Sequence, residues 1–326
     1  MFAEAIEHIL RDACTPAHVR DIEAGGSHAA LWGALADAGF LELMAPEHQG
    51  GASLPLEELF PVLLHFGRYA IPVPVAQAIA ARALVGPGTT LPGGLLTFAP
   101  ALTRCEGGKL RCPLVPFGAI SDHVLAADGD QLLLLSCADA QRVSVGIAHS
   151  QLATLTWPND HSAERIVGDS AALAPTAAAL HAALLAGAMT RVFEMTLQYC
   201  NGRSQFGKSL GKFQAVQHQL SIMAEQVAAS SVAAEAAFQT TRPTPRLLAA
   251  AIAKSRTSEA APGVANMAHA LHGAMGVTDE YELQLFTRRL HEWRLAHGAE
   301  SYWNRLIGER VLADSTTLID FVGAAY

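Results

Sequence analysis

The residues best suited to chemistry in this chain gather in one short stretch, Tyr199 to Gly211, which reads YCNGRSQFGKSLG. Arg203 and Lys208 supply positive charge there, and the glycines let backbone amides approach a ligand closely. This combination suits a phosphate group. Residues 202–209 also match G-x-x-x-x-G-K-S, the pattern of a phosphate-binding P-loop, letter for letter.

The segment before this stretch argues against a P-loop, because a P-loop must follow a buried β-strand. From Thr176 to Cys200, apolar residues recur every three or four positions, which predicts a helix of about seven turns. The recurring residues are Leu180, Leu184, Ala188, Val192, Met195 and Tyr199. A P-loop nucleotide hydrolase is therefore kept only as a remote alternative.

Composition argues against several classes of protein. Thirty acidic against twenty-two basic residues give a formal net charge of −8, which argues against a nucleic-acid-binding surface. The five cysteines are scattered without a C-x-x-C pair, so we expect neither a disulfide scaffold nor a metal site. The N-terminus, MFAEAIEHILRDAC, predicts a charged amphipathic helix rather than a signal peptide, and no run of eighteen apolar residues occurs. We therefore expect a cytoplasmic protein without a membrane span.

The hydrophobic share of 51%, with a mean hydropathy of +0.23, is high and owes much to alanine on predicted helices. Such helices must pack against something. Two explanations stay open: oligomerisation, or a tightly packed alanine-rich bundle within one chain.

The pattern divides the chain into three regions. Residues 1–91 predict an N-terminal helical domain whose last long helix, Leu56 to Tyr69, can be capped by Ser53. Residues 92–170 predict a small central β-domain with turns at Gly107-Gly108 and Gly129-Asp130. Its predicted strands are GGLLTFAPAL, DHVLAAD, QLLLLSC, RVSVGIA and LATLTWP.

Residues 171–326 predict a C-terminal four-helix bundle with antiparallel neighbours. After the helix that ends at Cys200, a second helix runs from near Gly211 to the Pro243 and Pro245 pair, and a third ends at His272. Two further helices are separated at Gly298. The fold class is therefore α+β and helix-dominated.

This order of elements, together with two motifs, resembles the acyl-CoA dehydrogenase superfamily over nearly the whole chain. One motif is Arg203-Ser204-Gln205-Phe206-Gly207, followed by Phe213-Gln214 and Gln217-His218. The other is HGAMGVTDE at 272–280, followed by Arg288-Arg289, which is similar to the H-G-[GA]-x-G-x-T-x-E of the bacterial branch.

The resemblance implies FAD as cofactor and α,β-dehydrogenation of an acyl-CoA, as in the β-oxidation of fatty acids or steroid side chains. It also implies that FAD lies at a subunit interface. Arg203 and Phe206 would reach the diphosphate of a flavin held by the neighbouring subunit, with Gln214 close by. The backbone from Gly273 to Gly276 would lie near the adenine half. Electron-transfer flavoprotein is an electron acceptor that the resemblance implies.

The chain departs from the family pattern where the catalytic base is expected. Family members remove the α-proton with a carboxylate, which usually precedes a glycine between the last two helices. This chain has Ala296-His297-Gly298-Ala299 there, so His297 replaces the carboxylate. A second branch carries a glutamate as base, beside an arginine, at the start of the first bundle helix, and those two positions are Ala177 and Ala178 here. The loop that normally lines flavin and thioester is also absent from the β-domain.

Three explanations of these departures stay open. His297 can act as the base, because neutral imidazole accepts a proton near pH 7. Alternatively Glu300, Glu292 or Asp279 can take that place. The third explanation is the one we favour: the chain resembles the short, base-less subunit of a heteromeric, steroid-type acyl-CoA dehydrogenase, whose partner chain supplies the carboxylate. A homo-oligomer remains the other assembly.

Overall fold

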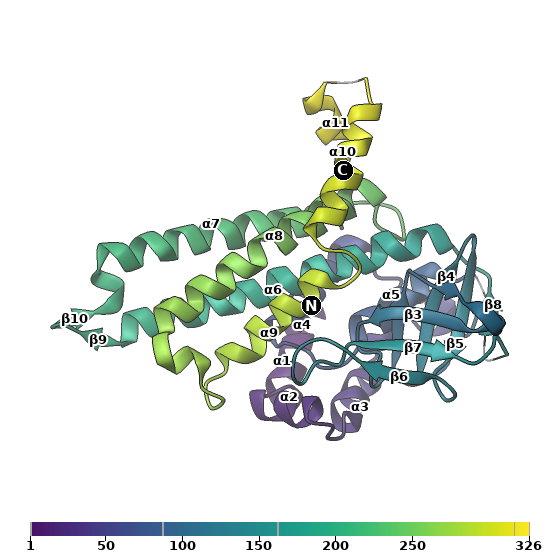
Figure 1. Cartoon of the computed structure of the whole chain (residues 1–326), viewed down its shortest axis with the longest axis horizontal. Helices are drawn as coiled ribbons and strands as arrows, with labels where there is room; N and C mark the ends of the chain where they lie inside the picture. Colours follow the sequence, from purple (N-terminus) through teal and green to yellow (C-terminus); the bar gives the residue numbers. More distant parts are fainter. Residues whose placement is uncertain (1, 87, 162, 316, 326) are drawn as a thin grey trace.

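The computed structural model describes residues 2–86, 88–161, 163–315 and 317–325. Helices dominate it, and a small β-domain interrupts them (Figure 1). The helices are α1 (Phe2–Ala13), α2 (Pro16–Glu23), α3 (Ala29–Asp37), α4 (Leu56–Arg68), α5 (Val75–Leu84), α6 (Leu173–Gly202), α7 (Gln214–Ala236), α8 (Leu247–His272), α9 (Leu283–Leu295), α10 (Glu300–Ala313) and α11 (Leu318–Ala325). The predicted fold class, helix-dominated α+β with a C-terminal bundle, is confirmed.

Helix α6 is the central element of the molecule and packs against α4, α7, α8 and α9. Its backbone approaches α4 very closely, since a Cβ added to Gly187 would lie 2.1 Å from the Leu64 carbonyl oxygen. The reciprocal contact occurs at Gly67, where a Cβ would lie 2.2 Å from the Leu184 carbonyl oxygen. The segment 170–202 is long and apolar enough to cross a membrane, but 94% of its most apolar window is buried inside the protein. Its hydropathy is thus explained by its central position.

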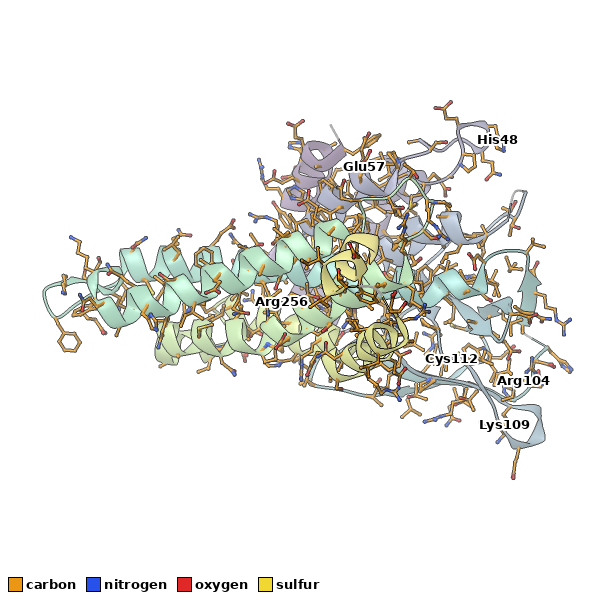
Figure 2. All side chains as sticks on the ribbon, turned by 90° about the horizontal axis from the view of Figure 1, so that it is seen from above. His48, Glu57, Arg104, Lys109, Cys112 and Arg256 are labelled. Carbon is orange, nitrogen blue, oxygen red and sulfur yellow. The ribbon has the colours of Figure 1, made fainter. Side chains whose placement is uncertain are left out.

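The β-domain consists of two four-stranded sheets. One sheet has the order β1-β4-β5-β8 and the other has the order β2-β3-β7-β6. The strands are β1 (Leu96–Ala99), β2 (Thr103–Arg104), β3 (Leu110–Val115), β4 (His123–Asp128), β5 (Gln131–Ser136), β6 (Gln141–Ser144), β7 (Ala153–Trp157) and β8 (Ala163–Ile166). Figure 2 shows this domain at the end of the molecule opposite the tip of the bundle, with Arg104 and Lys109 at its outer edge.

The first sheet is buried on both faces. On β5, Leu133 and Leu135 join the small core shared by the two sheets, whereas Leu132 and Leu134 join the large helical core. Successive side chains of a strand point to opposite faces. The double burial therefore explains why the sequence of β5, QLLLLS, is a continuous apolar run instead of an alternating one.

Within the described part of the β-domain, the sequence interpretation missed three strands: β2, β3 and β8. The physical reason is clearest in β3, where Pro113 argues against a strand assignment. The register with β7 shifts between Cys112 and Val115, and Leu114 has a φ of 51°. The proline is thus accommodated at an irregularity of the strand. The five predicted strands are all confirmed, as β1, β4, β5, β6 and β7.

The N-terminal helices also differ from the prediction, which did not identify α2 or α5 as separate helices. Helix α2 was not predicted, although Thr15 caps it by accepting a hydrogen bond from the His18 amide at 3.3 Å. Ser53 does not cap α4, because its hydroxyl accepts a hydrogen bond from the Glu47 amide at 3.2 Å. Pro55 occupies the position before the first residue of α4.

Helix α9 is tied to the N-terminal helices by buried ion pairs. The Glu23 carboxylate of α2 lies 2.6 Å from the Arg288 guanidinium and 2.9 Å from that of Arg289. Glu23 and Arg289 have side chains only 2% exposed. These contacts hold α9, and with it the turn that follows, in a fixed position against the rest of the fold.

Candidate functional site

The predicted site residues fall into two groups along α6, one at its C-terminal end and one beside its N-terminal third. Figure 1 shows the β9–β10 hairpin at one end of α6 and the β-domain toward the other. At its C-terminal end the chain leaves the bundle as a short hairpin of β9 (Ser204–Gln205) and β10 (Lys208–Ser209). We call residues 203–213 the Arg203 hairpin. At the N-terminal end, α6 faces the β-domain and the turn between α9 and α10, which carries His297.

The Arg203 hairpin holds its two predicted ligand-binding side chains in solvent. The amide of Arg203 donates to the Tyr199 carbonyl at 2.9 Å, and its carbonyl accepts from the Leu210 amide at 2.9 Å. The backbone is thus fixed while the guanidinium remains exposed. Phe206 has a φ of 53° and a 90% exposed side chain. A phenylalanine this exposed contributes little to the stability of the single chain.

Gln214 and the two predicted glycines have different surroundings. Gln214 is the exposed first residue of α7, directly after the hairpin. Gly273 follows α8 with φ 59° and ψ −140°, a conformation that glycine alone adopts readily. Gly276 is buried, and a Cβ there would lie 2.8 Å from the Cβ of His272. Packing therefore explains Gly276 without a ligand.

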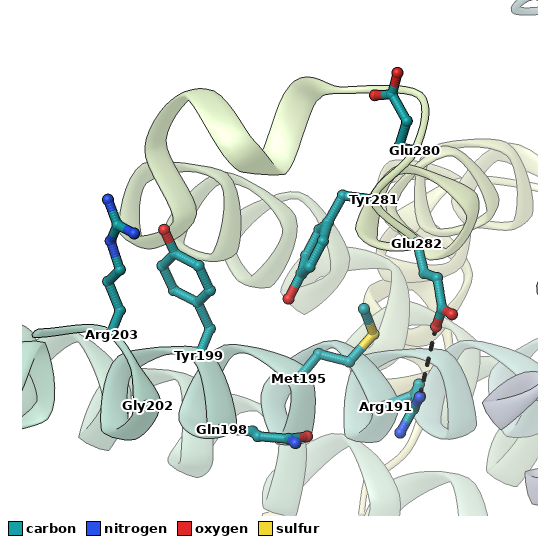
Figure 3. A pocket seen from close by; sticks show the side chains of 9 residues that line it. All are labelled: Arg191, Met195, Gln198, Tyr199, Gly202, Arg203, Glu280, Tyr281 and Glu282. Carbon is teal, nitrogen blue, oxygen red and sulfur yellow. Dashed lines mark ion pairs between the residues drawn. The ribbon is translucent and has the colours of Figure 1, made fainter.

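A cavity of about 590 Å³ opens beside the hairpin, which we call the Arg203 cavity. Figure 3 shows Arg203 and Tyr199 rising from the end of α6, while Tyr281 descends toward Met195 from the opposite segment. Arg191 and Glu282 form an ion pair of 3.7 Å at its other end. The lining residues are Arg191, Met195, Gln198, Tyr199, Gly202, Arg203, Glu280, Tyr281 and Glu282.

His272 holds the glycine turn in place. Its Nδ1 lies 2.8 Å from the Ala268 carbonyl oxygen and its Nε2 lies 3.2 Å from the Tyr281 hydroxyl. Its ring stacks on Tyr199 with centroids 4.4 Å apart. Both ring nitrogens are therefore occupied, so this histidine has a structural role.

The P-loop alternative is wrong, because residues 173–202 before the motif form α6 and not a strand. Lys208 does not reach into a phosphate cradle either. Its Nζ lies 4.2 Å from the centroid of the Phe213 ring and 3.4 Å from the Lys212 carbonyl oxygen.

His297 lies on the turn between α9 and α10 with a φ of 56°. It lines a second cavity, of about 360 Å³, which we call the His297 cavity. One side of this cavity comes from the β-domain and the other from the start of α6, the turn and α10. The lining residues are Phe98, Ala99, Pro100, Ala101, Pro113, Leu114, Val115, Ala174, Leu295, His297, Gly298, Tyr302 and Trp303.

Two buried residues that the sequence interpretation missed contact His297 or the turn that carries it. The ring of His181, from α6, meets that of His297 edge-on with centroids 4.8 Å apart. Lys254, from α8, is fully buried and donates to the Ser258 hydroxyl at 2.8 Å. It also donates to the carbonyls of Arg294 at 2.8 Å and Gly298 at 3.1 Å, which flank the turn. We call His181, His297 and Lys254 the imidazole–lysine cluster.

Burial governs the protonation of this cluster. It lowers the pKa of His181 to about 3, with the neighbouring Lys254 cation adding to the effect. Burial, then His181 and Lys254, also lower the pKa of His297 well below its usual value. Burial is also the main cause that lowers the pKa of Lys254, to about 7. Both imidazoles are therefore neutral near pH 7.

Carboxylates are absent from the described lining of the His297 cavity. The two alternative family positions, Ala177 and Ala178, are buried alanines within α6. Glu300 forms two hydrogen bonds with Arg294, one of them 3.0 Å long, and this pairing lowers the pKa of its carboxyl. Glu292 lies 3.3 Å from Arg289. Asp279 is exposed in the turn after Gly276.

The structure thus brings the predicted residues together in two groups and keeps the groups apart. Arg203, Phe206 and Gln214 are neighbours at one end of α6, with the Gly273 turn beside them through Tyr199 and His272. His297 instead packs against His181, in the N-terminal third of α6. His181 and Arg203 are 22 positions apart, which is about 33 Å of helix, so Arg203 and His297 cannot contact the same reacting atoms within one chain.

Comparisons with known proteins agree with this architecture. The family model for the acyl-CoA dehydrogenase C-terminal domain matches residues 173–312. Acyl-CoA dehydrogenase IpdE2 of Mycolicibacterium smegmatis is 32% identical over 268 residues, which cover 80% of this chain and 81% of that protein.

Two solved structures share the fold. A chain of the ChsE4-ChsE5 complex from Mycobacterium tuberculosis superimposes with a TM-score of 0.84 at 22% identity, over 97% of both chains. Butyryl-CoA dehydrogenase of Megasphaera elsdenii gives 0.79 at 17% identity, over 95% of this chain and 97% of that one. With the sequence relationship to IpdE2, these findings show that the chain belongs to the acyl-CoA dehydrogenase family.

Proposed function

We propose that this chain is one subunit of a two-chain, FAD-dependent acyl-CoA dehydrogenase. Its Arg203 hairpin contributes to a flavin site on a partner chain, which carries the catalytic carboxylate. The observation that carries the proposal is the separation of Arg203 from His297 along α6. One flavin cannot use both groups of one chain, whereas two chains packed together can combine one group from each.

The character of the Arg203 hairpin supports a role in trans. Its guanidinium has no hydrogen bond or ion pair among the described residues, and Phe206 is 90% exposed. A guanidinium presents paired N–H donors that match a diphosphate. FAD supplies the acceptor for the β-hydride when it is bound. Gln214 and the Gly273 turn would complete the surface of this chain toward the cofactor.

The opposite end of α6 supports the loss of the chain's own base. Removing an α-proton requires a group whose pKa is tuned near the working pH. Burial instead lowers the pKa of His297, and Glu300 is held as a carboxylate by Arg294. Neither group has the raised basicity of a carboxylate in an apolar site.

The ChsE4-ChsE5 structure is named as a complex of two different proteins, which supports a heteromeric assembly here as well. We therefore propose a second acyl-CoA dehydrogenase chain as partner and an acyl-CoA as substrate, with electron-transfer flavoprotein as acceptor. We also propose a cytoplasmic location and the division into residues 1–91, 92–170 and 171–326.

A homo-oligomer in which His297 is the base is the second candidate. It is favoured by one observation, namely that His297 occupies the family's base position and lines a cavity. In that case each chain would supply both groups to different sites.

A visible absorption spectrum distinguishes the two candidates. The chain is purified alone and after co-expression with the acyl-CoA dehydrogenase-like chain encoded nearest to it, and bound oxidised flavin is measured. We expect a colourless lone chain and a yellow, active complex. A yellow lone chain that oxidises acyl-CoA, and loses this activity in His297→Gln, would instead support the homo-oligomer.

A further inference from the structure

Lys254 is a buried cation that has no carboxylate as a direct partner among the described residues. The residue is 0% exposed. Its ammonium donates to the Ser258 hydroxyl at 2.8 Å and to the carbonyls of Arg294 and Gly298 at 2.8 and 3.1 Å. None of these acceptors is charged. A charge held away from water without a direct counter-ion is unfavourable, so the fold disfavours the protonated form of this side chain.

The turn between α9 and α10, residues 296–299, supplies part of this enclosure. Two of the three acceptors belong to the end of α9 and to this turn, whereas Ser258 belongs to α8 itself. Helix α8 is fixed by its packing against α6, α7, α9 and α10. Gly298 both accepts from Lys254 and lines the His297 cavity. A shift of the turn therefore removes two acceptors and opens a path for water from the cavity to the ammonium.

The backbone of the turn also favours such a shift. His297 has a φ of 56°, a conformation that is unfavourable for residues other than glycine. The turn itself is held by few hydrogen bonds, which run from the Ala296 amide to the Glu292 carbonyl and from the Gly298 amide to the Leu295 carbonyl. Segments of this kind open locally while the core of the protein stays folded.

The charged and titratable groups around Lys254 come from each helix that packs on α8. Glu300 of α10 favours the ammonium and Arg294 of α9 disfavours it, but these two side chains are hydrogen-bonded to each other. His181 of α6 and His297 of the turn are neutral near pH 7, because burial lowers the pKa of both. The titratable residues of α7 are all exposed: His218, Glu225 and Glu235.

The sign of the pH dependence follows from a comparison of the closed and the open turn. Burial lowers the pKa of Lys254 from 10.5 to about 7 in the closed turn. In an open turn water reaches the amine, which returns its pKa toward the ordinary value. Between these two values the open turn binds a proton that the closed turn refuses, so a fall in pH favours the open turn. Below pH 7 both states are protonated and the dependence levels off.

We propose that Lys254 makes the α9–α10 turn a proton-sensitive latch, which closes over the neutral amine and opens when the amine takes up a proton. Opening of this latch widens the junction between the helical bundle and the β-domain, because His297 and Gly298 line the cavity there. The inference goes beyond the proposed function, since it concerns the single chain and requires neither flavin nor a partner chain.

Hydrogen–deuterium exchange of the full chain tests the latch at pH 7, 8 and 9. The reporters are the Ala296 and Gly298 amides, which are hydrogen-bonded only while the turn is closed. Their protection factor, the exchange rate of a free amide divided by the observed rate, corrects for the effect of pH on exchange itself. We expect this factor to rise by at least about tenfold from pH 7 to pH 9. Neither His181 nor His297 can produce that change, because neither titrates in this range.

Two variants assign the effect to one side chain. Lys254→Met keeps a long unbranched side chain but removes the amine, so the protection factor of the turn should change by less than about twofold over the same range. Lys109→Met, at an exposed position of the β-domain, is the matched control and should keep the wild-type dependence. Circular dichroism checks that both variants are folded.

Three results would overturn the proposal. They are a wild-type protection factor that is constant or falls as pH rises, a wild-type dependence that persists in Lys254→Met, and exchange of the turn at the same rate as the core amides of α6. The last result would mean that the turn opens only when the whole chain unfolds. If Lys254→Met does not fold, the wild-type dependence and the comparison with α6 still decide the outcome.

Discussion

Toward its N-terminal end α6 is enclosed by the β-domain, α8 and the turn that carries His297, and the imidazole–lysine cluster beside it is buried. At its C-terminal end the same helix runs into the Arg203 hairpin (Figure 1). Arg203 and Phe206 in the hairpin, and Gln214 directly after it, are exposed. Contacts within the chain explain the first end, apart from two imidazole nitrogens. They do not explain the second. The difference suggests that the hairpin is completed by another chain, while the enclosed end must be stable by itself.

The largest difference should appear when a methyl group is added to a glycine in the enclosed middle of α6 and to one at its exposed C-terminal end. In Gly187→Ala the new Cβ would meet the Leu64 carbonyl oxygen at 2.1 Å, and neither backbone can move easily. We expect a loss of roughly 3 kcal/mol in the free energy of unfolding, measured by denaturant titration. Gly202→Ala is the matched control, because nothing lies within 4 Å of its Cβ. Equal effects of both substitutions would contradict the comparison.

Acid should lower the free energy of unfolding through the buried His181 of the enclosed end. Burial lowers the pKa of His181 from 6.5 to about 3, so the unfolded chain takes up a proton that the folded chain refuses. Stability is therefore lost as pH falls from 6.5 toward 3, by about 2 kcal/mol between pH 7 and pH 5 for this residue.

The measurement is the free energy of unfolding of wild type and of His181→Phe at both pH values. The variant should lose clearly less stability on acidification, since it has no proton to gain at this position. His218→Asn, at an exposed site of α7, is the control and should keep the wild-type slope. An unchanged slope in His181→Phe would speak against a buried neutral imidazole.

Arg203→Ala should weaken the complex while leaving the chain itself intact. Loss of charge-assisted hydrogen bonds to a diphosphate should reduce flavin affinity of the two-chain complex by at least about tenfold. The free energy of unfolding of the lone chain should change by less than about 0.5 kcal/mol. Arg242→Ala, another exposed arginine, is the control. Retention of full flavin content in Arg203→Ala would remove the main support for the proposed function.

The smallest effect is expected for Phe206→Ala in the single chain. Because the side chain is 90% exposed, its loss should change the free energy of unfolding by less than about 0.5 kcal/mol. In the complex we expect a few-fold loss of flavin affinity. A stability loss above 1 kcal/mol in the lone chain would show that the hairpin packs within its own chain.

Sequence patterns predicted the long elements because those elements have long periodic signals. Helix α6 and helix α8 were both identified from their apolar periodicity. Short elements were not predicted where one residue argued against the element. In β3 this residue is Pro113, because proline is disfavoured within a strand. Helix α2, only eight residues long, has too few turns for a periodic signal.

The candidate site was predictable only in part, since motifs carry order along the chain and not distance in space. The exposed hairpin was found because Arg203 and Phe206 stand in a recognisable motif. His181 and Lys254 were missed, because each interrupts an alanine-rich run, TAAALHAALLAG and AAAIAKSRT, without a motif of its own. A titratable residue inside such a run is a usable signal, since a core helix must provide it with partners.

The double burial of the first sheet has a consequence for how the polypeptide reaches its native state. Cut out by itself, the segment from 92 to 170 would expose Leu96, Phe98, Leu125, Leu132 and Leu134, which belong to the large helical core. Such a fragment would present a wide apolar surface and tend to aggregate. The β-domain therefore depends for its solubility on helices that precede and follow it in the sequence. It can reach its native packing only after the C-terminal helices have been synthesised.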